Sequence, residues 1–152
     1  MNDQPQALRQ TLNFYLDPLQ GGKMLKEAAE LVKKNQYTQI VYTGMGSSFF
    51  NSHIALYYLN SKGIPTYVQD AGEMIYFNPP KAQSSTKSLF IGVSQSGESG
   101  ELVKFLEKWH NIWKMSIDLW AITNTPNSTL ANKASNTFLT LEIGRASCRE
   151  RV

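Results

Sequence analysis

Two short segments rich in serine and glycine carry the residue types in this sequence that are suited to binding an anion. The first is Gly44-Met45-Gly46-Ser47-Ser48 and the second is Ser94-Gln95-Ser96-Gly97-Glu98-Ser99. Each follows a β-branched or apolar run and precedes a run with helical periodicity. Each therefore leads into a helix N-terminus, where unpaired N–H groups and the helix dipole attract anions. The side chains that add neutral donors are those of Ser47, Ser48, Ser94, Gln95, Ser96 and Ser99.

This combination of donors suits a phosphate monoester. Several hydroxyl, amide and backbone N–H groups converge, and glycine lets the backbone approach a ligand closely. Neither segment contains lysine or arginine. We therefore expect moderate affinity, as suits a metabolite that must be released.

Two other interpretations of these segments are open. A serine- and glycine-rich loop after a strand is often only a turn followed by a helix cap, although two such loops favour a binding site. A dinucleotide site is the main chemical rival, because Gly44 and Gly46 begin its fingerprint and Asp70 is placed to meet a ribose. The third glycine of that fingerprint would fall at Phe49, so the match is incomplete. No GxxxxGK[ST] run occurs, which excludes a P-loop.

The candidates for proton transfer are few. His53 and His110 lie inside expected helices and are expected to pack or to face solvent. Glu73 and Glu98 lie near strand ends and are better acid candidates, although a solvated or capping role is favoured for each. We assign no catalytic residue. Cys148 is the only cysteine, so we expect neither a disulfide nor a cysteine-ligated metal in residues 1–141, and no cofactor.

The elements that must position these segments follow from hydrophobic periodicity. Strands are expected at 39–43, 66–69, 88–93, 119–123 and 137–141. Helices are expected at 5–15, 23–34, 49–60, 101–114 and 129–133, the last capped by Ser128, with one or two helical turns at 71–76. This alternation predicts an α/β fold with a parallel sheet covered on both faces.

Two strand orders suit this alternation. The flavodoxin-like order 2-1-3-4-5 reverses direction between the first and third strands. Ligands of such sheets bind outside the carboxyl ends of the strands at that reversal. Under this order the two serine-rich segments face each other across one crevice.

Length and composition indicate one soluble domain. The chain has 152 residues, of which 41% are hydrophobic and 18% charged. No apolar run reaches about 18 residues, and the N-terminus lacks the pattern of a signal peptide. The formal net charge of +3 includes three arginines of the last eleven residues, and no basic run occurs. We expect a cytoplasmic protein that binds neither nucleic acid nor membrane.

The two segments, together with Ala121-Ile122-Thr123-Asn124, resemble a SIS (sugar isomerase) domain. The likeness covers residues 4–141 and is greatest to the first SIS domain of the glutamine–fructose-6-phosphate aminotransferase group and its glutaminase-free relatives. That group has threonine where Ser99 stands, and the hydroxyl is kept. The resemblance implies a three-layer αβα fold with a parallel sheet of order 2-1-3-4-5.

The resemblance also implies a ligand and partners. The ligand is a phosphosugar of the fructose 6-phosphate or glucosamine 6-phosphate class, and the usual chemistry is ketose–aldose isomerisation, which needs a general base. In this group the base and an assisting lysine come from a second SIS domain and a C-terminal tail, so we expect this chain to be inactive alone and its parent to be a homodimer. The phosphate would be held by Ser48, Ser94, Gln95, Ser96 and Ser99, with Ser47 close by and Gly46 and Gly97 shaping the loops.

The resemblance thus implies a fragment of a double-SIS isomerase, aminotransferase, deaminase or deglycase that acts on aminosugar or ketosugar phosphates. Two alternatives to this enzyme fragment stay open. The first is a non-catalytic regulatory SIS module that senses a phosphosugar. Such regulators carry a helix-turn-helix module ahead of the domain, and the residues before the first expected strand are too few and not basic enough for one. The second is a complete single-domain isomerase.

The expected domain organisation has three parts. Residues 1–36 form a helical lead-in and residues 37–141 form the SIS domain. Residues 142–152 follow neither a helical nor a strand period and match a translated sequencing-adapter oligonucleotide. We therefore expect them not to be native and the natural chain to continue past Leu141.

Overall fold

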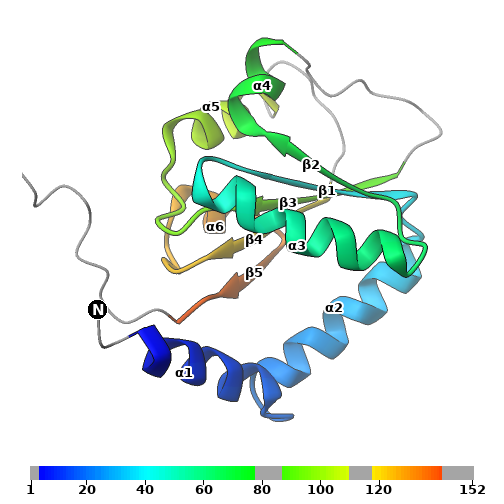
Figure 1. Cartoon of the computed structure of the whole chain (residues 1–152), viewed down its shortest axis with the longest axis vertical. Helices are drawn as coiled ribbons and strands as arrows, with labels where there is room; N and C mark the ends of the chain where they lie inside the picture. The colour runs from blue at the N-terminus through cyan, green and yellow to red at the C-terminus, as the bar shows by residue number, and fades with distance from the viewer. Residues whose placement is uncertain (1–3, 78–86, 110–117, 142–152) are drawn as a thin grey trace, which may run out of the picture.

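A parallel sheet forms the middle layer of the computed structural model, which describes residues 4–77, 87–109 and 118–141 (Figure 1). Within these residues the sheet has five strands in the order β2-β1-β3-β4-β5, and every pair is parallel. This confirms the α/β class and the flavodoxin-like order. The strands are β1 (Gln39–Gly44), β2 (Thr66–Asp70), β3 (Ser88–Val93), β4 (Asp118–Thr123) and β5 (Asn136–Leu139).

Helices cover both faces of the sheet, as right-handed crossovers require. The chain moves from β1 to the edge strand β2 in one direction, and then from β2 through β5 in the other. Helices of the two runs therefore fall on opposite faces. The helices are α1 (Gln4–Leu16), α2 (Gly21–Asn35), α3 (Ser47–Ser61), α4 (Ala71–Tyr76), α5 (Gly100–Lys108) and α6 (Thr129–Lys133).

The core is divided by the sheet into two layers. Successive strand residues point to opposite faces, so Phe90 packs with α4, α5 and α6 while Leu89 and Ile91 pack with α2 and α3. This is why β3 is an almost continuous apolar run: it lies at the centre of the sheet and is buried from both sides. The aromatic rings of Phe90 and Trp109 meet edge to face at 4.6 Å in the first layer.

The two N-terminal helices pack on the sheet. The Tyr15 hydroxyl donates to the Leu139 carbonyl at 2.9 Å, and the Tyr15 ring lies 6.5 Å from that of Phe138 on β5. A Cβ at Gly21 would lie 2.7 Å from the rings of Phe14 and Tyr15, so the junction of α1 and α2 needs glycine. The expected lead-in thus supplies part of one helical layer, which it shares with α3.

The expected elements are found, with shifts at their ends. The helix expected at 101–114 begins at Gly100, and α5 ends at Lys108; residues 110–117, with His110, lie outside the described part. The strand expected at 137–141 is β5, Asn136–Leu139. The loop expected at 78–87 lies outside the described residues except for Lys87. The tail expected at 142–152, with Cys148, also lies outside them.

The amino end of the sheet holds a polar cluster that is structural. The Tyr37 hydroxyl donates to the Asp118 carboxylate and accepts from the Asn35 side-chain amide. Burial, with the hydrogen bond to Asp118, raises the pKa of Tyr37 to about 12. Burial alone raises the pKa of Tyr42. Both groups stay neutral near neutral pH. No helix among the described residues has the length and apolar character needed to span a membrane.

Candidate functional site

The two serine-rich loops leave the sheet side by side. The strand register pairs Gly44, the last residue of β1, with Val93, the last residue of β3. A Cβ at Gly44 would lie 2.6 Å from the Val93 carbonyl oxygen, closer than real Cβ contacts come, so the approach requires glycine. Both loops therefore start from neighbouring positions at the carboxyl edge, where the strand order reverses.

The first loop leaves the N-terminus of α3 open to a ligand. Gly46 is the N-cap residue, with φ of +53° and open space around it, and no side chain caps the helix. Ser47 is exposed and Ser48 is half-buried. N–H groups in the first turn of a helix have no intrahelical acceptor, so this turn offers donors together with the positive end of a 15-residue helix. The Ser48 N–H is an exception, because it donates to the Met45 carbonyl at 3.1 Å.

The second loop divides its hydroxyl groups between two roles. Ser94 is only 3% exposed, and its Oγ accepts from the Gly97 N–H at 3.1 Å and lies 2.9 Å from the Ser99 Oγ. These two serines therefore hold the loop in shape from within. Gln95 and Ser96 are exposed, and the Ser96 Oγ accepts from the Glu98 N–H at 3.2 Å.

The second loop is also anchored to the start of α6. Gly97 has φ of +67°, and a Cβ there would lie 2.0 Å from the Ser128 Oγ. The Gly97 carbonyl accepts from the Leu130 N–H at 3.1 Å. The Glu98 carboxylate accepts from the Thr129 N–H at 2.5 Å. These contacts join residues about thirty positions apart and hold the loop against α6.

The two loops attract an anion through neutral hydrogen-bond donors and not through cationic side chains. Neither loop carries a lysine or arginine, and no group of three or more His, Cys, Asp and Glu side chains in the described residues is placed to hold a metal ion. Glu98 is directed to the α6 N-terminus by its bond to Thr129. The arrangement can bind an anion by hydrogen bonds and helix dipoles.

Comparison with known proteins agrees with this geometry. The SIS domain family model matches residues 29–147. The chain belongs to the SIS domain family. This confirms the resemblance found in the sequence.

Relatives of this SIS domain include glutamine–fructose-6-phosphate aminotransferases (isomerizing). The protein of Synechocystis sp. is 31% identical over 165 residues, which cover 97% of this chain and 25% of that protein. The protein of Pseudomonas putida is 32% identical over 155 residues, which cover 98% of this chain and 24% of that protein. The chain thus spans about a quarter of the length of these relatives.

Solved structures share the SIS fold. The C-terminal domain of glucosamine-fructose-6-phosphate aminotransferase from Francisella tularensis superposes with a TM-score of 0.75 at 26% identity, covering 95% of this chain and 38% of that one. Tagatose-6-phosphate ketose/aldose isomerase from Escherichia coli has a TM-score of 0.71 at 20% identity, covering 92% of this chain and 38% of that one. The sugar isomerase domain of an RpiR transcription factor from Sphaerobacter thermophilus has a TM-score of 0.66 at 24% identity, covering 91% of this chain and 70% of that one.

Two polar residues considered from the sequence have structural roles in this SIS domain, and a third, Glu73, faces solvent. Glu98 caps α6, as expected for a capping glutamate. Asp70 caps α4, because its Oδ1 accepts from the Gly72 and Glu73 N–H groups. Glu73 is exposed in the first turn of α4.

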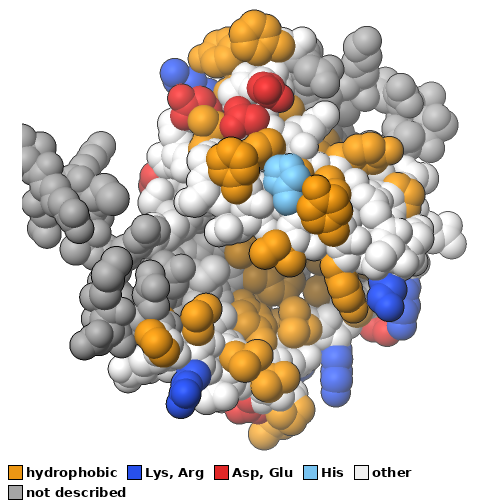
Figure 2. Space-filling view, viewed as in Figure 1, with side chains coloured by type: hydrophobic (Ala, Val, Ile, Leu, Met, Phe, Trp, Pro, Cys, Tyr) orange, Lys and Arg blue, Asp and Glu red, His pale blue; other side chains and the backbone are white. Residues whose placement is uncertain are grey.

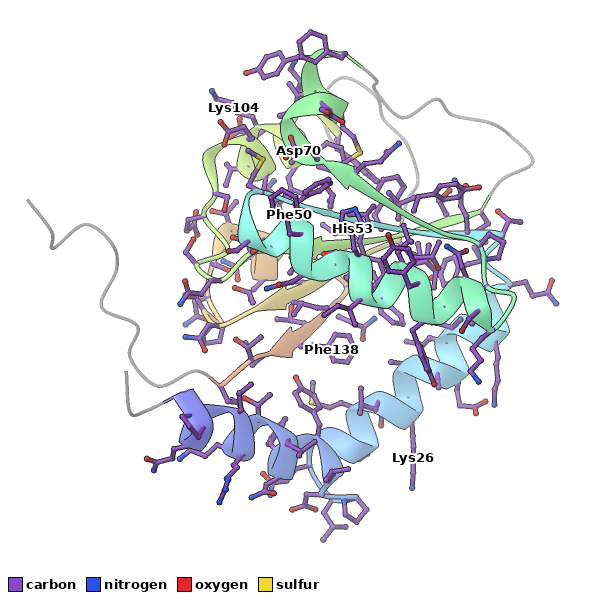
Figure 3. The ribbon with its side chains drawn as sticks, in the orientation of Figure 1. Lys26, Phe50, His53, Asp70, Lys104 and Phe138 are labelled. Atoms are coloured by element: carbon purple, nitrogen blue, oxygen red, sulfur yellow. The ribbon has the colours of Figure 1, made fainter. Side chains whose placement is uncertain are left out.

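His53 packs as expected. Its Nδ1 lies 3.2 Å from the Phe49 carbonyl oxygen, and its ring lies edge to face with Phe49 and stacked with Phe50. Phe50 and His53 lie on the outer side of α3 (Figure 3).

The anchoring contacts of the second loop were missed from the sequence. Ser128 was recognised only as a helix cap, and Thr123 only as part of a motif. The contact that matters joins Gly97, which has positive φ, to the distant small residue Ser128. A single sequence does not reveal which distant residues come into contact.

Proposed function

We propose that this SIS domain binds a phosphorylated sugar of the fructose 6-phosphate or glucosamine 6-phosphate class. The observation that carries the proposal is the pair of hydroxyl-rich loops at the adjacent carboxyl ends of β1 and β3, each leading into a helix N-terminus. Sugar phosphates occur in the names of its relatives. The proposed ligand-binding residues are Gly46, Ser47, Ser48, Ser94, Gln95, Ser96, Gly97 and Ser99.

The roles of these residues follow from their exposure. Ser96 and Gln95 face solvent and would touch the phosphate directly, with Ser48 approaching from α3. Ser94 and Ser99 would act at its inner side, where their hydroxyls already form a pair. Gly46 and Gly97 have positive φ and would shape the two loops.

We propose that the domain, residues 37–141 with the lead-in 1–36, serves in a cytoplasmic double-SIS isomerase, aminotransferase, deaminase or deglycase acting on aminosugar or ketosugar phosphates. Such chemistry moves a proton between adjacent carbons and needs a base. The two loops contain no histidine or lysine, and their one carboxylate, Glu98, is bonded to the Thr129 N–H. The base would therefore come from a second SIS domain.

The test of the binding proposal is a thermal titration of the full chain. Fructose 6-phosphate or glucosamine 6-phosphate at about a hundred times its Kd should stabilise the fold by about 2.7 kcal/mol. This corresponds to a rise in Tm of roughly 5–10 °C for a chain of this size. Fructose without phosphate is the matched control. A rise with NAD and none with either sugar phosphate would show that the proposal is wrong.

A phosphosugar-sensing module without catalysis is the second candidate function. The same SIS fold in the sugar isomerase domain of an RpiR transcription factor supports this candidate. Deuterium uptake at the carbon beside the fructose 6-phosphate carbonyl distinguishes the two candidates. Uptake catalysed by the intact parent protein supports an enzyme, and binding without uptake supports a sensor.

We propose that a second copy covers the outer face of α3. Phe50, Ile54, Tyr57 and Tyr58 are 63–75% exposed there, and Figure 2 shows hydrophobic side chains gathered over this helix. The helix has no charged residue from Ser47 to Ser61. A face of this kind pairs with an identical face without charge repulsion, as in two-fold dimers.

The variant Ile54→Lys/Tyr57→Lys tests this homodimer. It places two charges in the centre of the face, and we expect at least about a hundredfold weaker self-association, because two central contacts are lost. Light scattering after gel filtration measures the mass. Leu25→Lys on α2 is the control and should leave the dimer intact. A monomeric wild-type chain, or a double variant that still dimerises, contradicts the proposed interface.

A further inference from the structure

The carbonyl of Gln95, in the middle of the second loop, is held by two donors from the end of β4. The Thr123 Oγ1 donates to it at 3.1 Å and the Asn124 N–H donates at 2.9 Å. A carbonyl oxygen has two lone pairs, so these bonds use its full capacity. The peptide between Gln95 and Ser96 is thereby held in one orientation.

That orientation turns the next N–H group toward the first loop. In a planar trans peptide the C=O and the following N–H point in opposite directions, and the described residues contain no cis peptide. The Gln95 carbonyl points toward β4, on one side of β3. The Ser96 N–H therefore points to the other side, where β1 ends and Ser47 and Ser48 begin α3.

The Thr123 side chain is placed to donate its hydroxyl proton to the Gln95 carbonyl. Its side chain is completely buried, with an exposed fraction of 0%. The Thr123 Oγ1 also accepts from the Thr125 N–H at 3.3 Å, which leaves its single proton for the Gln95 carbonyl. The Thr123 backbone carbonyl accepts from the Thr140 N–H at 3.0 Å, so the residue is held on both sides.

We infer that Thr123 is a positioning residue of the anion site: its buried hydroxyl orients the Gln95–Ser96 peptide so that the Ser96 N–H serves as a phosphate donor. Thr123 itself does not touch the ligand. The inference rests on the proposed function, since it assigns a supporting residue to the same site. It extends the site from the two loops to the end of β4.

The test compares three variants of the full 152-residue chain. Thr123→Val removes the hydroxyl at nearly constant shape, and Thr123→Ser keeps it. Thr66→Val is the matched control, because Thr66 is also buried and its Oγ1 donates to the Ile64 carbonyl at 3.0 Å, at the opposite edge of the sheet.

The readouts are the Kd for fructose 6-phosphate and the amide NMR signal of Ser96 during titration with inorganic phosphate. In the wild type we expect the Ser96 signal to be among those that shift most. Thr123→Val should weaken sugar-phosphate binding about tenfold, as for one misplaced donor to a charged group, and should abolish the Ser96 shift. Thr123→Ser should restore binding to within about twofold, and Thr66→Val should leave it unchanged.

Several results would overturn the inference. One is a wild-type Ser96 signal that does not move while the sugar phosphate binds. This measurement needs no variant, so it tests the inference even if Thr123→Val fails to fold. Others are unchanged binding in Thr123→Val, or equal weakening in Thr66→Val. A wild-type chain that binds neither fructose 6-phosphate nor phosphate contradicts the proposed function itself, which distinguishes the two failures.

Discussion

Gly97→Ala should destabilise the domain by about 2–5 kcal/mol, because two costs add at this position. The backbone of Gly97 has φ of +67°, a region that residues with a Cβ rarely adopt. The new methyl group would also lie 2.0 Å from the Ser128 Oγ and 2.4 Å from its Cβ. Urea unfolding followed by circular dichroism measures the loss, and sugar-phosphate binding should disappear with the loop.

Gly63→Ala is the control that separates the two costs. Gly63 also has positive φ, +77°, but nothing lies within 4 Å of a Cβ there. We expect a loss of about 1 kcal/mol from the backbone conformation alone. Adding Ser128→Gly to Gly97→Ala should recover part of the stability, since it removes the clashing atoms and glycine is a tolerated helix cap. Equal losses in Gly97→Ala and Gly63→Ala would refute the packing argument.

The second large effect is expected for Ser94→Ala/Ser96→Ala, which should weaken fructose 6-phosphate binding at least about a hundredfold. Loss of the exposed Ser96 hydroxyl removes a hydrogen bond to a charged group, worth about 1.5–3 kcal/mol. Loss of the buried Ser94 hydroxyl removes the contacts to the Gly97 N–H and the Ser99 hydroxyl that shape the loop. Isothermal titration calorimetry measures the binding. The fold should survive, because the Gly97 N–H also donates to the Ser94 carbonyl at 3.2 Å and so keeps a partner.

Ser135→Ala is the control for the paired serine variant. The Ser135 Oγ donates to the Leu119 carbonyl at 3.0 Å, at the amino end of the sheet and away from the loops. Its loss should cost about 1 kcal/mol of stability and leave binding unchanged. Native-like affinity in Ser94→Ala/Ser96→Ala, with the fold intact, would mean that the second loop does not hold the phosphate.

Much of the fold was predictable because the signals for it are local. Residues 88–93 form an almost continuous apolar run, which is typical of a strand buried on both faces, and β3 occupies that place. The helical spacing of Leu102, Phe105, Leu106 and Trp109 predicted the buried face of α5, and all four side chains are buried. The handedness of crossovers then limits the ways in which such elements can assemble.

The ends of elements were less predictable. Apolar spacing carries the helical prediction on to residue 114, whereas α5 ends at Lys108. The spacing of apolar side chains reports which face of a segment is buried, and it does not report where backbone hydrogen bonding stops. Asp70 shows the same limit, because its carboxylate suits a ribose hydroxyl or a helix cap equally well, and in the structure it caps α4.

Local sequence patterns are enough to predict the element types, the strand-loop-helix setting of both serine-rich segments and the neutral, hydroxyl-rich chemistry of the candidate site. Which hydroxyls face inward, as in Ser94, and which face solvent, as in Ser96, depends on how the chain packs in three dimensions. The same packing lets Thr123, Ser128 and Thr129 hold the second loop. The physical reason is that composition and periodicity are properties of neighbouring residues. Hydrogen bonds between positions about thirty residues apart exist only once the sheet has brought the ends of β3 and β4 together.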